Sequence, residues 1–275
     1  MSAAPHSIDL DAYFRRIGLK GEVAADLPTL QAIQFAHVAA IPFENLSPLL
    51  GEAVRLDAAS LEDKLVRRGR GGWCFEHNLL LAHVLRALGF SLQTLAARVR
   101  WNVAAGTTTP RSHCLLLVDI EGERHVADVG FGGLTLTAPL ALREGEQATP
   151  HERHRLVREG DGYALEAKVA GEWQRLYVFD LVPALQADYE VSNWYLANHP
   201  ESLFVKGLVA ARADVDRRHA LRNGRYSIHY RDGRTERQVI TDAAELKRVL
   251  AEDLKIPLPN GDALDGKLEA VLRNV

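Results

Sequence analysis

The spacing of apolar residues changes in kind near residue 90, and this change most limits what the chain can fold into. Before it, helical spacing predicts helices over 9–17, from Thr29 to a point before Pro42, from Ser60 to Gly69, and over 73–88. After it, short apolar runs between turn residues predict strands over 92–101, 113–120, 124–129, 153–158, 163–169 and 173–179. We therefore expect a helical first part followed by an antiparallel sheet or small barrel.

A further unit follows the helix-breaking Pro200. Its predicted strands cover 204–210, 218–221, 226–230 and 235–240, and predicted helices over 243–254 and 263–273 close the chain. The dipeptides Asn223-Gly224 and Asp232-Gly233 are typical of two-residue hairpin turns. The last part of the chain is therefore expected to combine strands and helices.

Composition and charge exclude several classes of partner. The 275 residues are 47% hydrophobic and 25% charged, as in ordinary globular proteins. A formal net charge of −3 argues against nucleic acid or an anionic membrane as partner, because both attract a clustered cationic excess. The first ten residues lack the apolar stretch of a signal peptide, and no apolar run approaches the ~18 residues of a membrane span. We expect a cytoplasmic protein, and the oligomeric state stays open.

Cys74 is the candidate nucleophile. The chain has two cysteines and no C-x-x-C pair, so neither a disulfide framework nor a cysteine zinc site is signalled. Cys74 lies where the helix over 73–88 begins, and a helix N-terminus favours the thiolate, which is the form that attacks. The amides of Gly71-Gly72 and Phe75 are candidate donors to an oxyanion. Cys114 has aliphatic neighbours in its strand, which is typical of core packing.

His113 and Asp128 are the candidate base and its orienting residue. A nucleophilic thiol needs both, and eleven histidines are present. If a two-residue turn within 121–123 joins the adjacent strands, His113 and Asp128 project from one face, because side chains alternate along a strand. With the turn at residues 121 and 122 the two are diagonal neighbours within hydrogen-bonding reach. The same parity places His125 and Cys114 on the other face, whereas a three-residue loop would reverse the result.

Other residues beside these motifs have competing interpretations. The segment 130–133 (GFGG) is either a plain turn or a place where a pyrophosphate approaches backbone amides. Glu76 and His77 are adjacent on a helix and face different ways, and no His-x-x-x-His spacing exists, so no metal site is predicted. Arg70 either pairs with an acidic residue such as Glu76 or is solvated.

Three motif blocks resemble those of the arylamine N-acetyltransferases: 70–78 (RGGWCFEHN), 112–113 (SH) and 128–132 (DVGFG). Segments 42–46 and 193–204 are also similar to that family, so the likeness covers most of the chain. The resemblance implies an α+β fold with a cysteine-protease-like triad core. It divides the chain into a helical domain at 1–89, an antiparallel β-barrel domain at 90–195 and an α/β lid domain at 196–275.

The resemblance also implies the chemistry. Acetyl-CoA would acetylate Cys74, and an arylamine, arylhydrazine or hydrazide would then take the acetyl group in a ping-pong cycle, as in xenobiotic metabolism. His113 would be the base and Asp128 its orienting residue. The implied acceptor pocket consists of Phe43, Val99, Phe131 and Phe204, and the glycines implied near CoA are Gly130, Gly132 and Gly133.

Three alternatives use the same residues differently. A hydrolase or transglutaminase-like enzyme would act on amides, with water or an amine as acceptor. An amide synthase would close a macrocycle from a carrier-bound acyl chain. A binding module would keep the triad as a vestige, although the intact Cys74, His113 and Asp128 argue against this reading.

Overall fold

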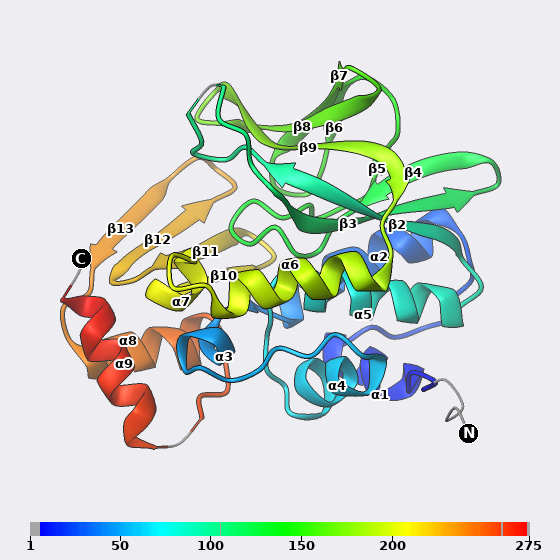
Figure 1. Ribbon diagram of the computed structural model, residues 1–275. Helices are drawn as coiled ribbons and strands as arrows, with labels where there is room; N and C mark the ends of the chain where they lie inside the picture. Colours follow the sequence, from blue (N-terminus) through cyan, green and yellow to red (C-terminus); the bar gives the residue numbers. More distant parts are fainter. Residues whose placement is uncertain (1–5, 105, 260, 274–275) are drawn as a thin grey trace.

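The fold contains two antiparallel β-sheets, and the helices lie below them in the view of Figure 1. The computed structural model describes residues 6–104, 106–259 and 261–273. Within these ranges the larger sheet has eight strands and the smaller sheet has five. No helix in the described ranges is both long enough and apolar enough to span a bilayer.

The helices of the first third are α1 (Leu10–Ile17), α2 (Leu27–Ala40), α3 (Leu46–Leu49), α4 (Ala58–Leu61), which continues as a π-helix (Glu62–Arg67), and α5 (Cys74–Ala87). The prediction that Ser60 caps the third helix is wrong. Asp57 is the cap, and its Oδ1 accepts the Ser60 N–H at 3.0 Å. An aspartate one turn earlier was the stronger capping signal, because its carboxylate also interacts favourably with the helix N-terminus.

Helix α5 lies inside the protein, as its apolar sequence predicts. It packs on β2 (Ser91–Val99) and β3 (Arg111–Ile120) and against α4 (Figure 1). The side chains of Leu80, Leu81 and Leu85 have no exposed surface. A helix that is apolar on most sides must be covered on most sides, and the sheet and the N-terminal helices supply that cover.

The larger sheet contains β2 and β3 together with β4 (Glu123–Ala127), β5 (Leu140–Ala141), β6 (Gly145–Ala148), β7 (Arg153–Glu159), β8 (Gly162–Val169) and β9 (Glu172–Pro183). Its strand order is β5-β4-β3-β2-β9-β8-β7-β6. Gln147 of β6 connects the two edge strands, because its side-chain amide bonds to the Ala141 N–H and C=O, each at 2.9 Å. These bonds nearly close the sheet into a barrel and satisfy backbone groups that an open edge would expose.

The hairpin of β3 and β4 turns at residues 121 and 122, which is the arrangement that makes His113 and Asp128 diagonal neighbours. Ile120 pairs with Glu123, which leaves Glu121 and Gly122 as the turn. Both turn residues have positive φ, 54° and 86°, so the turn is of type I′. Continuing the register places Asp128 diagonally from His113 on the same face of the sheet.

The smaller sheet joins distant parts of the chain. Its strands are β1 (Phe43–Glu44), β10 (Val209–Ala213), β11 (Arg217–Arg222), β12 (Arg225–Tyr230) and β13 (Thr235–Val239), in that order. One face packs on α8 (Ala243–Arg248), its π-helical continuation (Val249–Asp253) and α9 (Asp262–Leu272) (Figure 1). The pairing of β1 with β10 brings Phe43 next to the C-terminal third.

The predicted strand at 204–210 is wrong in its first half. Residues Leu203–Lys206 form α7, with Ser202 accepting the Phe204 N–H at 3.3 Å, and β10 begins only at Val209. A short apolar run does not distinguish a helical turn from a strand, and the serine cap decides the outcome here. The preceding helix α6 (Gln186–Asn198) was not predicted.

In the described ranges, the buried apolar side chains form three clusters, which lie against the faces of the two sheets. Leu116 belongs to the cluster under α5, Leu115 to the cluster inside the barrel, and Leu221 to the cluster beneath α8 and α9. The expected fold class, α+β with a helical N-terminal part, a barrel-like antiparallel sheet and a C-terminal α/β part, is confirmed. The domain limits 1–89, 90–195 and 196–275 stay a prediction.

The β3–β4 turn gives a test of the register. Replacing Glu121 by Asn should raise the free energy of unfolding by about 0.5–1 kcal/mol, because Asn adopts positive φ more readily than Glu. Replacing Gly122 by Ala should lower it by about 1 kcal/mol through backbone strain alone, since no atom outside the turn lies within 4 Å of the added Cβ. Urea unfolding measures both changes. Glu123→Asn, outside the turn, is the control, and destabilisation by Glu121→Asn would contradict the type I′ geometry.

Candidate active site

Cys74 is the first residue of α5, directly after the N-cap residue Trp73. The Glu76 carboxylate accepts the Trp73 N–H at 3.1 Å and so fixes the start of the helix. The thiol is largely buried, and its Sγ lies 3.6 Å from the carbonyl oxygen of Ser112, the residue before His113. The predicted position of Cys74 at a helix N-terminus is confirmed.

Two buried ion pairs hold the segment before Cys74. Arg70 Nη2 lies 2.7 Å from Glu44 Oε1, and Lys64 Nζ lies 2.7 Å from Glu76 Oε1. Of the two interpretations of Arg70, pairing with an acidic residue is confirmed and solvation is wrong. The partner is Glu44, which β1 brings to it, and not Glu76. Burial alone would raise the pKa of Glu44, but the charges of Lys64 and Arg70 outweigh it and lower the pKa.

The two glycines before Trp73 serve close packing. A Cβ on Gly71 would lie 2.0 Å from the carbonyl oxygen of Pro42, and a Cβ on Gly72 would lie 2.6 Å from the Glu76 carboxylate. The Gly72 N–H donates to the same Pro42 oxygen at 3.3 Å, so the expectation that it donates to an oxyanion is wrong. The Phe75 amide is in the first turn of α5 and has no helix carbonyl to accept it.

His113 and Asp128 form a buried ion pair, with His113 Nε2 2.7 Å from Asp128 Oδ2. Burial would lower the pKa of His113, but the Asp128 carboxylate and, to a smaller extent, the Cys74 side chain outweigh it and raise the pKa to about 10. The pKa of Asp128 is lowered, because His113 and hydrogen-bond donors outweigh the effect of its burial. The pair is therefore charged at neutral pH.

Asn78 is a site residue that the sequence interpretation missed. Its Nδ2 donates to Asp128 Oδ1 at 2.9 Å and to the Cys114 carbonyl at 2.7 Å, while its Oδ1 accepts the Val129 N–H at 3.0 Å. It therefore ties α5 to β3 and to the segment after β4. The spacing of four residues from Cys74 was the available signal, since residues i and i+4 share a helix face.

Only one of the two imidazole nitrogens of His113, Nε2, bonds to Asp128. Nε2 faces Asp128, so Nδ1 is free to exchange a proton with Cys74. The rings of Tyr177 and Phe131 flank the imidazole at centroid distances of 4.8 and 5.3 Å. Cys114 lies on the opposite face of β3, fully buried in the cluster under α5, and burial raises its pKa well above the ordinary value. The structure thus brings Cys74, His113 and Asp128 together, and their catalytic roles stay a prediction.

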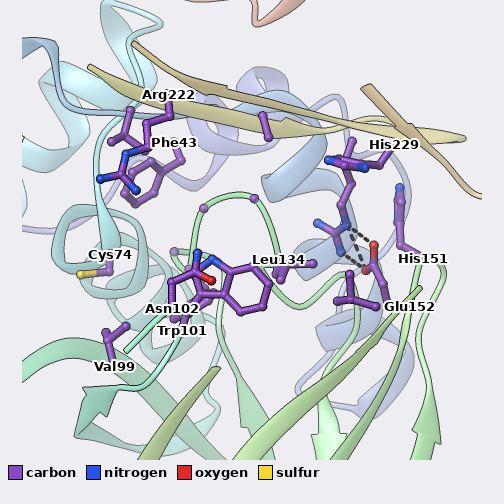
Figure 2. A pocket seen from close by; sticks show the side chains of 18 of the residues that line it. Phe43, Cys74, Val99, Trp101, Asn102, Leu134, His151, Glu152, Arg222 and His229 are labelled. Atoms are coloured by element: carbon purple, nitrogen blue, oxygen red, sulfur yellow. Dashed lines mark hydrogen bonds and ion pairs between the residues drawn. The ribbon is translucent and has the colours of Figure 1, made fainter. Parts of the chain in front are cut away.

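A cavity of about 1030 Å³ opens beside this group. Figure 2 shows Cys74, Phe43 and Val99 at one end and His151 and Glu152 at the other. All the residues that the family resemblance implied for the acceptor or for CoA line this cavity: Phe43, Val99, Phe131, Phe204, Gly130, Gly132 and Gly133. Trp101 also lines it and was not predicted as a site residue.

One wall of the cavity is a face of the smaller sheet. Ala220 of β11 pairs with Ala211 and Ser227, and its neighbours in the alternating pattern, Arg218 and Arg222, share its face. Cationic side chains lining the cavity are Arg153, Lys168, Arg218, Arg222, Arg231 and Arg237. The wall is therefore suited to an anionic ligand such as a phosphate.

The glycines after Asp128 divide into two kinds. A Cβ on Gly130 would lie 2.6 Å from the Cys74 Cα, so Gly130 is required for packing against the start of α5. The Gly130 N–H also donates to Asp128 Oδ1 at 2.9 Å. Gly132 and Gly133 also line the cavity but have no such close contact, and their nearest neighbours are Phe43 and Ala220.

The combination of a buried thiol, an imidazole and a deep cavity supports nucleophilic transfer of an acyl group. The thiol is the predicted nucleophile, and His113, held by Asp128, is the predicted group that exchanges its proton. No three His, Cys, Asp or Glu side chains of the described residues are grouped so as to hold a metal ion.

The charged His113–Asp128 pair predicts an unusual titration. In NMR spectra the His113 imidazole should stay protonated through neutral pH and titrate near pH 10. In Asp128→Asn the burial effect is no longer opposed by the carboxylate, so the pKa should fall to or below the ordinary 6.5. The pair stabilises the fold fully between about pH 3.8 and pH 6.5, the ordinary pKa values of the two groups. This contribution is lost as the pH rises through about 10, where His113 loses its proton, and as the pH falls through the lowered pKa of Asp128. A His113 titration midpoint below pH 7 in the unmodified protein would contradict the ion pair.

The contact between Gly130 and Cys74 predicts a second result. Gly130→Ala should lower the free energy of unfolding by about 1–3 kcal/mol, because the new methyl group meets backbone atoms that cannot move aside. Gly133→Ala is the matched control, since its nearest neighbour would be the Ala220 Cβ at 3.7 Å. Equal urea midpoints for the two variants would show that the segment after Asp128 does not pack on α5 as described.

Comparison with known proteins gives a consistent family assignment. A family model described as N-acetyltransferase matches residues 26–263. The arylamine N-acetyltransferase of Mycolicibacterium smegmatis is 44% identical over 98% of both chains, and that of Escherichia coli K12 is 41% identical over 88% of this chain and 87% of the relative.

Solved structures agree with these matches. An M. smegmatis arylamine N-acetyl transferase structure has a TM-score of 0.92 and 43% identity, covering 97% of this chain and 99% of its own. The Mycobacterium marinum arylamine N-acetyltransferase in complex with CoA has a TM-score of 0.91 and 41% identity, with the same coverage. The chain therefore belongs to the arylamine N-acetyltransferase family.

Proposed function

We propose that this protein transfers an acetyl group from acetyl-CoA to the nitrogen of an arylamine, arylhydrazine or hydrazide through an acetyl-cysteine at Cys74. The observation that carries the proposal is the arrangement of Cys74 and the charged His113–Asp128 pair at one end of a cavity of about 1030 Å³. The family's name supplies the acceptor class, and the CoA complex of the M. marinum relative supports the donor.

In the first half-reaction the Cys74 sulfur attacks the thioester carbonyl of acetyl-CoA. The attacking form is the thiolate, because the thiolate and not the thiol is the nucleophilic form of a cysteine. The new bond joins Cys74 Sγ to the acetyl carbon, and the bond from that carbon to the CoA sulfur breaks. CoA leaves as a thiol after taking the proton from His113. The Phe75 amide, in the first turn of α5, is suited to stabilise the oxyanion that forms on the way.

In the second half-reaction the amine nitrogen attacks the acetyl carbon on Cys74. The N–C bond forms, the C–S bond breaks, and His113, now neutral, accepts the proton that the nitrogen loses. Cys74 returns to its thiolate form, so the cycle is balanced. Asp128 stabilises the imidazolium formed in this step and fixes the ring, which leaves Nδ1 toward the sulfur.

The aromatic acceptor is proposed to bind between Phe43, Val99, Phe131 and Phe204. Phe43 and Phe204 lie with ring centroids 6.3 Å apart, and the Phe131 ring stands edge-on to His113. Four apolar side chains around the end of the cavity that contains Cys74 would cover the faces of a small aromatic ring and present its nitrogen to the acetyl group.

The donor is proposed to extend along the cavity away from Cys74. CoA carries its charge on phosphates that a long uncharged pantetheine arm separates from the thioester. The pantetheine arm would pass Gly132 and Gly133, and the phosphates would meet the cationic side chains of the opposite end, such as Arg237. A cytoplasmic location belongs to the same proposal, because the cytosol keeps thiols reduced.

Intact-protein mass spectrometry tests the acyl-enzyme directly. Acetyl-CoA alone should add one acetyl group to the protein, and an added arylhydrazide should discharge it. The Cys74→Ser variant should gain no acetyl group that a hydrazide can discharge, whereas Cys114→Ser, altered in the core, should still be acetylated. If the mass stays unchanged with acetyl-CoA while an amide substrate is cleaved, the hydrolase alternative replaces this proposal. Acylation only by a carrier-bound chain would favour the amide synthase.

A further inference from the structure

We propose that Arg222 selects acceptors that carry an anionic group, binding a carboxylate on the aromatic ring of the amine. This inference rests on the proposed function, because it concerns the acceptor end of the same cavity. The acceptor class it names is the aromatic amine or hydrazide with a carboxylate substituent.

The sheet register places Arg222 at the acceptor end of the cavity. Phe43 pairs with Ala211, and Ala211 with Ala220, so these residues share one face of the smaller sheet. Arg222 lies two residues along β11 from Ala220, and therefore on that same face, opposite Val209. Arg222, Val209 and Phe43 all line the cavity, and Figure 2 shows Arg222 beside Phe43, at the end that contains Cys74.

The side chain of Arg222 differs from those of Arg218 and Arg153 in having no partner in the described part of the chain. Arg218, two positions beyond Ala220 on the same face, is held by Glu152 through several bonds, including Nη2 to Oε2 at 2.6 Å. Arg153 pairs with Glu146 at 2.7 Å. The backbone of Arg222 pairs within the sheet, but its side chain makes no hydrogen bond, ion pair or ring contact with the residues that the structure describes. Its five donors are thus free for a ligand.

Acetyl-CoA, the proposed donor, has no anionic group that Arg222 would bind. The pantetheine arm beside Cys74 is uncharged, and the phosphates of CoA would lie at the opposite end of the cavity. An arginine next to an aromatic ring instead matches an aromatic ligand with an anionic substituent: Phe43 covers the ring, and the planar guanidinium binds the carboxylate in a bidentate way. Because Arg222 is exposed, solvent screens the pair, and its effect should be moderate.

Two acceptors of the same shape separate charge recognition from other effects. We would compare kcat/KM for 4-aminobenzoate and its neutral analogue 4-aminobenzamide, with acetyl-CoA as donor. Arg222→Ala should lower kcat/KM for the benzoate about fivefold and leave that for the benzamide within about twofold. Arg222→Lys should restore part of the loss, and added salt should weaken the benzoate preference of the unmodified protein.

The matched control is Arg225→Ala. Arg225 pairs with Arg222 across the β11–β12 hairpin and is equally exposed, but it does not line the cavity. The Arg225→Ala variant should therefore have unchanged kcat/KM for both acceptors. An equal loss for both acceptors in Arg222→Ala, or slower formation of acetyl-Cys74, would overturn the proposal, because either result assigns Arg222 to the donor or to the fold.

A binding measurement keeps this inference separate from the proposed function. Calorimetric titration of the resting protein with 4-aminobenzoate needs no turnover. If acetyl-CoA failed to acetylate Cys74, the proposed function would fall, yet weaker 4-aminobenzoate binding to Arg222→Ala than to Arg225→Ala would still support the carboxylate site. Equal binding to the two variants would refute it.

Discussion

The buried carboxylate of Asp128 is the constraint on which the rest of the site depends. A charged group without exposed surface is tolerated only when its oxygens are paired and hydrogen-bonded. Here the donors are the His113 imidazolium, the Asn78 amide and the Gly130 N–H, which come from β3, α5 and the segment after β4. The register of the hairpin and the docking of α5 are therefore coupled to the charge state of the site.

Close contacts and ion pairs at the N-terminus of α5 fix its position in addition to its apolar packing. The helix start meets Gly130 so closely that only a glycine fits, and the preceding loop is held on both sides, by Arg70 with Glu44 and by Lys64 with Glu76. Buried pairs of this kind contribute less to stability than to a single defined geometry. The proposed nucleophile is thus placed by contacts that reach β1 and, through it, the smaller sheet.

The sequence was informative where the relevant geometry was local. A glycine at position 122 predicted a two-residue turn, and strand alternation then placed His113 and Asp128 on one face. It was uninformative where partners are distant along the chain. Nothing near Arg70 indicates Glu44, because the pairing depends on a two-residue strand, β1, whose partner β10 begins at Val209. The short helix α7 was missed for a different reason, since a helix of four residues is too short to show a helical period in the sequence.

Both proposed substrates have to reach the same sulfur atom. Cys74 lies at one end of a single cavity, where Phe43 also lies, and the cationic side chains reach the other end. A donor extended along the cavity would place its acetyl group and the adjoining arm at the end where the acceptor ring must bind, so the two would compete for that space. A covalent acetyl group on Cys74 removes the conflict, because only the acetyl group stays behind when CoA leaves. One sulfur at one end of one cavity therefore favours two successive half-reactions over a complex that contains both substrates.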